Sequence, residues 1–367
     1  MRVLMTTDTI GGVWTFTREL SSELLAKGCA IAIASFGPLP SARQKEWIEQ
    51  QSSRWRDRFL FVASDAPLER MADNRKAFSA AAQVLMPLIE SFRPHALLSS
   101  QYCFGALPVF IPRIVVAHSD VLSLANARRT SMPPSEWLDH YRSIVSDGIG
   151  RADAIVAPTQ WMLDALGANF ALPTESYVIP NGCTLPPARL EPLRKLQAVT
   201  AGRLWDEAKN LRILEQVESS IPILIAGAVK CESASFRPSL ARLQFLGNLE
   251  PSSLHKLFRQ SAIYICTSIY EPFGFAPIEA AQCGCIVVAN DIPSLREVWG
   301  DSALFFEDSK SLSILLGMLQ RNSRFRARAR KRSELRALHF TSRRMAGKYF
   351  DLLRRFAPYA EAGSCAA

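Results

Sequence analysis

Residues 270–280 of the chain read Tyr-Glu-Pro-Phe-Gly-Phe-Ala-Pro-Ile-Glu-Ala. An apolar run typical of a buried strand precedes them at 262–267, and Pro277 stands near the first position of a predicted helix. A strand, a turn with glycine and a helix start aim free backbone N–H groups at an anion. Glu271 lies in the turn and Glu279 is expected in the first helical turn, so both carboxylates can line a crevice at the carboxyl end of a parallel sheet. Carboxylates in such a crevice suit the hydroxyl groups of a sugar or a ribose.

The remaining sequence alternates apolar runs typical of strands with amphipathic runs typical of helices. The first series has strands at 2–7, 29–36, 59–63, 95–99, 113–117 and 153–157, and helices at 13–27, 75–92 and 135–150. After a proline-rich break at 180–187, the second series has strands at 196–201, 223–226, 243–246, 262–267 and 286–289, and helices at 210–218, 251–260 and 276–282. This alternation predicts an α/β protein with two doubly wound parallel sheets, each in a Rossmann-like domain, and a ligand cleft between the facing domains.

The composition is typical of a globular protein with two domains of ordinary size. The 367 residues are 48% hydrophobic and 21% charged, which allows large cores. The eight cysteines are scattered and several stand in apolar runs, as buried free thiols in a reducing compartment do. The sequence starts with a strand and has no apolar run of the roughly 18 residues that cross a bilayer, so we expect a cytoplasmic protein without a secretory signal.

The net charge of +9 comes from one region. Between Arg321 and Arg355, thirteen basic residues stand against two acidic ones, which gives this region a net charge of +11. No nucleic-acid motif or aromatic stacking platform accompanies the basic residues, so we expect no nucleic-acid partner. The region is either a solvated helix face or a surface for an anionic membrane, and the sequence leaves both interpretations open.

Two cations follow the first strand of the second series. Arg203 stands just after the strand 196–201, and Lys209 stands at the entry to the next predicted helix. A planar guanidinium and a compact ammonium that converge on one point suit a diphosphate. The alternative is two unrelated surface cations.

Two further candidates follow strands of the first series. His118 closes the strand 113–117, and a histidine at the carboxyl end of a parallel strand points at the crevice, although a capped or core histidine is the alternative. Gly11 and Gly12 follow the strand 2–7 and allow a close approach of backbone to a ligand, or form only a flexible turn. No complete G-x-G-x-x-G fingerprint is present.

The two glutamates are separated by seven residues that include Pro-Phe-Gly-Phe. This pattern resembles the paired-glutamate motif of the family 4 retaining glycosyltransferases, and the resemblance is strongest over residues 199–297. It implies a hexosyltransferase-type enzyme of polysaccharide biosynthesis, which moves a sugar from a nucleotide-diphosphate sugar to a hydroxyl acceptor on a glycan, glycolipid or small molecule. It also implies the GT-B fold, with an acceptor-binding domain at 1–183, a donor-binding domain at 184–344 and a C-terminal helix at 345–367 that packs back on the first domain.

The resemblance assigns roles to individual residues. It gives catalytic roles to Glu271, His118, Arg203 and Lys209, and donor binding to Gly11, Gly12, Arg203, Lys209, Gly247, Leu249, Glu271, Phe273, Gly274, Phe275 and Glu279. In this assignment Glu271 holds hydroxyls of the donor sugar and Glu279 holds the ribose. Backbone N–H groups at 273–275 meet the sugar and phosphate, and residues 246–249 pass the base.

The chemistry implied by the resemblance retains the anomeric configuration. The bond to the diphosphate breaks first, and the acceptor hydroxyl then attacks from the same face and passes its proton to the leaving phosphate. Fixed cations stabilise the charge that grows on the phosphate. The sequence has no Asp-x-Asp pair, the usual anchor for a divalent cation in the other large glycosyltransferase fold. We therefore expect no required metal and no cofactor beyond the nucleotide-sugar donor.

The sequence departs from the family pattern at 226–228, which read Ala-Gly-Ala in place of the common Gly-x-Gly, so recognition of the base stays open. Three alternatives remain: a glycan synthase or phosphorylase of the same fold, a non-catalytic two-lobed sugar-binding protein, and an NAD-dependent oxidoreductase. The broken glycine fingerprint argues against the last of these. The missing export signal argues against the sugar-binding protein, and no lysine has a context that fits a Schiff base with pyridoxal phosphate.

Overall fold

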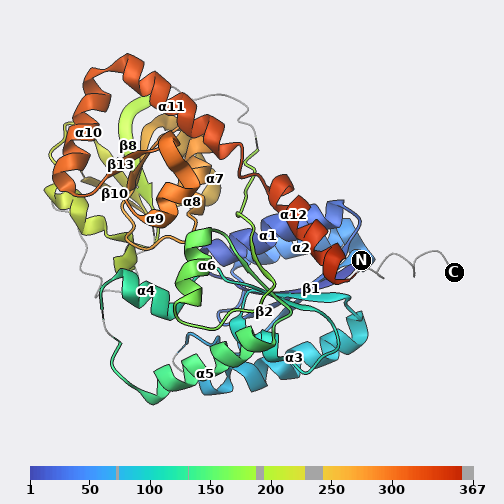
Figure 1. Cartoon of the computed structure of the whole chain (residues 1–367). Coiled ribbons are helices and arrows are strands. Elements are labelled where there is room, and N and C mark those ends of the chain that lie inside the picture. Colours follow the sequence, from blue (N-terminus) through green and yellow to red (C-terminus); the bar gives the residue numbers. More distant parts are fainter. Residues whose placement is uncertain (72–73, 131, 187–193, 228–242, 358–367) are drawn as a thin grey trace. The chain divides into compact units, whose positions relative to one another are not determined.

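The computed structural model describes residues 1–71, 74–130, 132–186, 194–227 and 243–357 (Figure 1). The chain divides into two compact units. Unit 1 comprises Met1–Gly182 and the chain from Ser342 onward, and unit 2 comprises Cys183–Thr341. Among the described residues, no helix has the length and apolar character needed to span a membrane.

Unit 1 contains a seven-stranded sheet in the order β3-β2-β1-β4-β5-β6-β7, and all of its strand pairs are parallel. Its strands are β1 (Arg2–Asp8), β2 (Ala30–Phe36), β3 (Phe59–Ala63), β4 (Ala96–Ser99), β5 (Arg113–Val116), β6 (Ala154–Ala157) and β7 (Ser176–Val178). The strand order reverses between β1 and β4. In doubly wound sheets, ligands bind outside the carboxyl ends of the strands at such a reversal.

The helices of unit 1 are α1 (Gly11–Ala26), α2 (Ala42–Trp55), α3 (Ala77–Phe92), α4 (Val121–Ala127), α5 (Glu136–Arg151), α6 (Gln160–Gly167) and α12 (Ser342–Phe356). Short 3₁₀ helices are η1 (Arg56–Arg58), η2 (Asn74–Lys76) and η3 (Tyr102–Ala106). The last helix, α12, packs on the first, α1 (Figure 1). The Tyr349 ring lies edge-on to Phe16 at 5.5 Å between centroids, and the Ser342 hydroxyl donates to the Glu19 carboxylate at 2.5 Å.

Unit 2 contains a six-stranded parallel sheet in the order β10-β9-β8-β11-β12-β13, which reverses between β8 and β11. Its strands are β8 (Lys195–Ala201), β9 (Ile223–Ala226), β10 (Leu243–Gly247), β11 (Ser261–Cys266), β12 (Ile286–Asn290) and β13 (Leu304–Phe306). Its helices are α7 (Pro251–Gln260), α8 (Phe275–Gln282), α9 (Pro293–Trp299), α10 (Ser309–Arg321) and α11 (Ser323–Ala337), with 3₁₀ helices η4 (Glu207–Lys209), η5 (Leu211–Gln216) and η6 (Gly300–Ser302).

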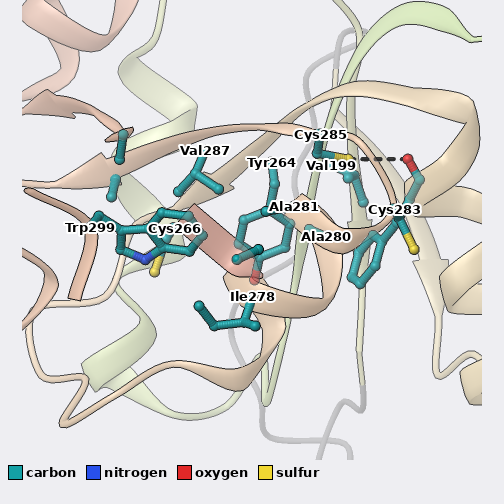
Figure 2. Close-up of a cluster of buried hydrophobic side chains, with 14 of the residues drawn as sticks. Val199, Tyr264, Cys266, Ile278, Ala280, Ala281, Cys283, Cys285, Val287 and Trp299 are labelled. Carbon is teal, nitrogen blue, oxygen red and sulfur yellow. Dashed lines mark hydrogen bonds between the residues drawn. The ribbon is translucent and has the colours of Figure 1, made fainter. Parts of the chain in front are cut away.

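The sheet of unit 2 is buried on both faces, as the continuous apolar runs of its strands predict. In β11, Tyr264 and Cys266 belong to one apolar cluster, while Ile263 and Ile265 belong to another. This alternation follows from the two-residue period of a strand. Figure 2 shows residues of the first cluster, which includes Trp299 of α9 and Cys266 of β11. The six cysteines in the described part of the chain are all buried.

The predicted parallel α/β architecture with two Rossmann-like domains is confirmed. One sequence-based expectation about a helix is wrong, and one helix was missed. The predicted helix 210–218 is instead the 3₁₀ helix η5, which follows Asn210 in the left-handed conformation. The helix α2 was not expected, because it buries none of its residues fully and therefore lacks the apolar stripe that periodicity detects.

Candidate functional site

In unit 2, candidate residues gather where the strand order reverses. β8 and β11 are parallel neighbours, so the segments that follow them leave from the same edge of the sheet. Arg203 and Lys209 follow β8, and Glu271 follows β11. Lys209 and Glu271, which are 62 positions apart in the chain, are thus brought together by ordinary βαβ winding, as the fold class predicts.

The structure joins Lys209 and Glu271 directly. The Lys209 ammonium lies 2.5 Å from Glu271 Oε2, and the Ser268 hydroxyl donates to the same oxygen at 3.1 Å. Both side chains of the ion pair are mostly buried, with 20% and 16% of their surface exposed. The Thr267 hydroxyl donates to the Lys209 carbonyl at 2.5 Å and so ties the segment after β8 to the end of β11. The sequence predicts both residues in the site, but it does not predict that they contact each other.

The environment of Lys209 keeps its side chain charged. Burial alone would lower the pKa of the ammonium group, but the negative charge of Glu271 and its hydrogen bond outweigh burial and raise that pKa above its ordinary value. The positive charge of Arg203 acts in the opposite direction and lowers the pKa of Lys209, but its effect is smaller. Each of the two cations has its own carboxylate partner: Lys209 contacts Glu271, and Arg203 contacts Asp206.

Arg203 is held by an acidic residue three positions along the chain. Its guanidinium donates to Asp206 Oδ2 at 2.5 and 3.2 Å, and Asp206 Oδ1 accepts from the Ala208 backbone N–H at 3.0 Å at the start of η4. Asp206 therefore fixes both the arginine and the 3₁₀ helix that ends in Lys209. With 42% of its side chain exposed, Arg203 keeps donors available to a ligand.

The turn before α8 depends on a glycine. Gly274 has φ +89° in the left-handed region and precedes the first helical residue, Phe275. A Cβ at Gly274 would lie only 3.1 Å from a Pro277 carbon and 3.2 Å from the Cγ of Glu271. A larger residue at this position would therefore displace Pro277 or the Glu271 side chain. Phe273 is buried and contacts Phe275 edge-on, with 5.7 Å between ring centroids.

The expectation that Glu279 lies in the first turn of this helix is wrong. The helix begins at Phe275, directly after the left-handed Gly274, so Glu279 is its fifth residue and lies in the second turn. At that position Glu279 Oε2 is 3.6 Å from His255 Nε2 on α7, and both side chains are mostly buried. The sequence gives no reason to connect His255 with the site.

The segment proposed to pass the base ends the edge strand β10. Gly247 is the last residue of that strand, has φ +71° and accepts a hydrogen bond from the Gly227 N–H at 2.8 Å. Leu249 packs against the apolar cluster that contains Val199 and Tyr264. Residues 228–242, which include the end of the Ala-Gly-Ala segment, lie outside the described residues.

In unit 1, the glycine pair begins α1 rather than forming a separate turn. Gly11 is the first helical residue and has φ +60°, and Gly12 follows it. The turn before them is fixed by Asp8, whose carboxylate accepts from the Ile10 N–H at 2.8 Å and from Arg70 at 2.7 Å. Neither Asp8 nor Arg70 is singled out by the sequence pattern.

His118 lies just beyond the end of β5 in unit 1 and is half-buried. Its Nε2 is 3.2 Å from the Ser100 hydroxyl, and its ring meets Phe16 edge-on at 4.6 Å. Burial, and to a lesser extent the charge of Arg70, lowers the pKa of His118 to about 3. The imidazole is therefore neutral at physiological pH. The following acidic residue, Asp120, caps α4 and accepts from the Tyr141 hydroxyl at 2.8 Å.

The predicted site residues thus fall into two groups. Arg203, Lys209, Gly247, Leu249, Phe273, Gly274, Phe275, Glu271 and Glu279 belong to unit 2, and Gly11, Gly12 and His118 belong to unit 1. Sequence reasoning missed the polar residues that support these groups, namely Asp8, Arg70, Ser100, Asp206, His255 and Ser268. Ser100 and Ser268 carried a usable signal, because each directly follows a predicted strand. In the described part of the chain, no three His, Cys, Asp or Glu side chains are grouped as metal ligands would be.

Comparison with known proteins places both units in one family type. Residues 10–185 match the family described as Glycosyltransferase Family 4, and residues 207–334 match the family described as Glycosyl transferases group 1. The serotype-specific mannosyltransferase WbdA of Escherichia coli is 25% identical over 184 residues, which cover 48% of this chain and 22% of that protein. The matched segment therefore spans about a fifth of the length of this relative.

Solved structures share the fold across nearly the whole chain. A sucrose-phosphate synthase from Thermosynechococcus elongatus aligns with a TM-score of 0.77 and 15% identity, covering 97% of this chain and 98% of that one. Anabaena HepE, solved in complex with UDP-glucose, aligns with a TM-score of 0.73 and 16% identity, covering 97% and 100%. Both sheets, both family matches and these likenesses agree, and the chain belongs to the family 4 glycosyltransferases and has the GT-B fold.

Proposed function

We propose that this glycosyltransferase transfers a sugar from a nucleotide-diphosphate donor to a hydroxyl group of an acceptor, with retention of configuration. The observation that carries this proposal is the cluster at the strand reversal of unit 2, where the Lys209–Glu271 ion pair and the Arg203–Asp206 ion pair follow the neighbouring strands β8 and β11. In this cluster the two cations can meet the diphosphate, and the Glu271 carboxylate can meet hydroxyls of the sugar. The UDP-glucose complex of the structurally similar HepE supports this class of donor.

Donor binding exchanges partners within the cluster. In the ligand-free protein, Glu271 neutralises Lys209. When a diphosphate arrives, its charge can replace the carboxylate as the partner of Lys209, while Arg203 supplies a planar set of N–H donors. Glu271 is then free to accept hydrogen bonds from hydroxyls of the donor sugar. The backbone N–H groups at 273–275, just before and at the start of α8, would face the sugar and phosphate, and Glu279 would accept from the ribose.

The same cations promote the chemical step. As the bond between the sugar and the diphosphate breaks, negative charge grows on the leaving phosphate, and Arg203 and Lys209 stabilise that charge more strongly than they stabilise the ground state. The acceptor hydroxyl attacks on the face that the phosphate leaves, and its proton passes to the phosphate. This route requires neither a metal nor a covalent enzyme intermediate, so we propose that the enzyme acts without a divalent cation.

In unit 1, Gly11, Gly12 and His118 are proposed to contact the reacting groups. The neutral imidazole of His118 can accept or donate one hydrogen bond without adding charge, which suits a sugar hydroxyl better than a phosphate. The left-handed Gly11 lets backbone approach a ligand where a side chain would intrude.

Nucleoside diphosphate release tests the function. The protein is incubated with UDP-, GDP- and ADP-sugars, with and without mono- and oligosaccharide acceptors, in excess EDTA and then with Mn²⁺. We expect one donor to release its nucleoside diphosphate in an acceptor-dependent manner in both media, with a retained anomeric centre by NMR. Lys209→Met should abolish release, whereas Lys45→Met on the exposed face of α2 should not. No heat of binding with any donor or nucleoside diphosphate would refute the proposal, an inverted product would refute retention, and activity only with Mn²⁺ would refute metal independence.

We also propose that the enzyme works in the cytoplasm, bound peripherally to an anionic membrane surface through α11. The helix has seven basic residues and one acidic residue. Small buried residues face its own unit: Ala329, Ser333 and Ala337. The opposite face presents four exposed basic residues with no acidic partner in the described part of the chain, followed by two exposed leucines: Arg324, Arg328, Lys331, Arg332, Leu335 (49% exposed) and Leu338 (59% exposed).

Basic residues followed by apolar ones on one helix face suit an interface with anionic headgroups, where the leucines enter the acyl boundary. Co-sedimentation with vesicles tests this. We expect binding to vesicles with phosphatidylglycerol but not to pure phosphatidylcholine, and a loss of binding in Arg328→Glu/Arg332→Glu and in Leu335→Ser/Leu338→Ser. Arg54→Glu on α2 serves as the matched control. Equal binding of all variants would exclude α11 as the contact.

A further inference from the structure

One histidine outside the predicted site contacts a carboxylate within it. Among the described residues, the only polar partner of the Glu279 carboxylate is His255, whose Nε2 lies 3.6 Å from Oε2. We propose that His255 is a positioning residue, which holds the Glu279 carboxylate ready for the ribose hydroxyls of the donor. This inference rests on the proposed function, because it takes Glu279 to be the ribose-binding residue.

The supports on both sides of the contact are rigid. His255 lies on α7, a helix that begins with a proline and buries Leu257 and Phe258 in the core of unit 2. Glu279 lies on α8 between Ile278 and Ala280, which are both fully buried. The two helices pack against each other. The imidazole and the carboxylate therefore face each other from two fixed backbones, and only side-chain rotations remain to be fixed.

Both side chains are mostly buried, so few water molecules compete with the contact between His255 and Glu279. The side chains are 17% and 15% exposed, so each has little water to bond with, and a small rotation of either one would shorten the 3.6 Å contact to a hydrogen bond. A free glutamate side chain loses rotamer freedom when a ligand orders it, and that loss weakens binding. A neighbour that already restrains the carboxylate in the ligand-free protein removes part of this cost. To donate a hydrogen bond to the carboxylate, His255 has to carry its hydrogen on Nε2. The side-chain amide of a glutamine at position 255 offers an equivalent N–H.

The contribution expected for His255 is confined to donor binding. Glu279 is proposed to touch the ribose and not the atoms that react, so losing its restraint should raise the Kd for the nucleoside diphosphate about 3- to 10-fold and leave kcat within about twofold. The same reasoning predicts that the effect vanishes for a ligand without ribose hydroxyls.

The test is calorimetric titration of the full chain with UDP, GDP and ADP and with the 2′,3′-dideoxy form of whichever binds. We expect His255→Ala and His255→Leu to weaken binding of the ribonucleotide about 3- to 10-fold and His255→Gln to stay within about twofold of wild type. None of these three substitutions should weaken binding of the dideoxy nucleotide relative to wild type. In a Glu279→Ala background, His255→Leu should add no loss. Lys256→Ala, an exposed position on the same helix, is the matched control.

The outcomes separate the two proposals. If Glu279→Ala weakens nucleotide binding but His255→Leu and His255→Ala do not, the positioning role is wrong and the donor site stands. If the His255 variants weaken ribonucleotide and dideoxy nucleotide alike, or add fully to Glu279→Ala, His255 is only a packing residue. If wild type binds no nucleotide, the proposed function falls, and this inference falls with it.

Discussion

The contact between Lys209 and Glu271 changes how each of these residues is interpreted. From the sequence they are separate groups, a cation for phosphate and a carboxylate for sugar. In the structure they form one mostly buried ion pair that also accepts from Ser268. Removing one partner of such a pair leaves the other charge poorly compensated. In the proposed donor complex, phosphate binding and sugar binding would therefore be coupled through a single contact, since a diphosphate that engages Lys209 would release Glu271.

Substitution of the two glutamates should separate binding from turnover. Glu271→Ala should lower kcat by about 100-fold or more, because it removes both the proposed hydroxyl contact and the partner of Lys209. Glu279→Ala should chiefly raise the KM for the donor, because its proposed contact is with the ribose. Steady-state kinetics with the donor varied measures both effects, with Glu46→Ala on α2 as the control. A near-normal kcat for Glu271→Ala would remove this residue from the catalytic group.

His118 should make stability depend on pH. Its pKa is lowered to about 3 in the folded protein, against about 6.5 for an unfolded chain, so between these values the unfolded state binds the extra proton. His118 thus costs no stability at a pH well above 6.5. Below pH 6.5 it lowers the free energy of unfolding, by about 1–2 kcal/mol at pH 5. Urea unfolding at pH 7.5 and pH 5 measures the loss, which should be smaller in His118→Gln. An equal loss in both proteins would assign the pH dependence to other groups.

Single elements show why sequence periodicity locates most of the structure. The strands β3 and β9 and the helix α7 have the bounds that the pattern predicts, because each combines an apolar run with clear end signals. The misplacement of Glu279 has the opposite origin. Pro277 is a strong start signal, but the helix begins at Phe275, directly after the left-handed Gly274 and two residues before Pro277. The supporting contacts of the site, such as His255 with Glu279, come from helices that no sequence pattern pairs.

The turn between β11 and α8 should tolerate no side chain at Gly274. The left-handed φ and the close approach of the Glu271 Cγ predict that Gly274→Ala costs about 1–3 kcal/mol of unfolding free energy and weakens nucleotide binding as well. Gly347→Ala in α12 is the matched control, because no atom lies within 4 Å of its added Cβ and alanine favours a helix. Urea unfolding and calorimetry measure the two effects. Unchanged binding in a destabilised Gly274→Ala protein would show that the turn supports the fold and not the site.

At the scale of the whole chain, the last described helix belongs to the same unit as the first strand. Residues after Ser342 return to unit 1, where α12 buries Met345, Tyr349 and Leu353 against the helix that begins at Gly11. Amphipathic spacing in the sequence predicts that α12 has an apolar face. It cannot predict which surface that face covers, because any exposed apolar surface of suitable shape would satisfy the pattern equally well.

Substitution of Tyr349 measures how much the packing of α12 stabilises unit 1. The side chain is fully buried, its hydroxyl has no hydrogen-bond partner among the described residues, and burial raises its pKa well above the ordinary value. Tyr349→Ala should cost about 3–5 kcal/mol of unfolding free energy, because it leaves a cavity against Phe16. Tyr349→Phe keeps the ring and removes an unsatisfied polar group, so it should be neutral or stabilise by about 1 kcal/mol. Guanidinium unfolding of both variants decides the point. A large loss in Tyr349→Phe would mean that the hydroxyl has a partner, and a small loss in Tyr349→Ala would mean that α12 contributes little to the stability of unit 1.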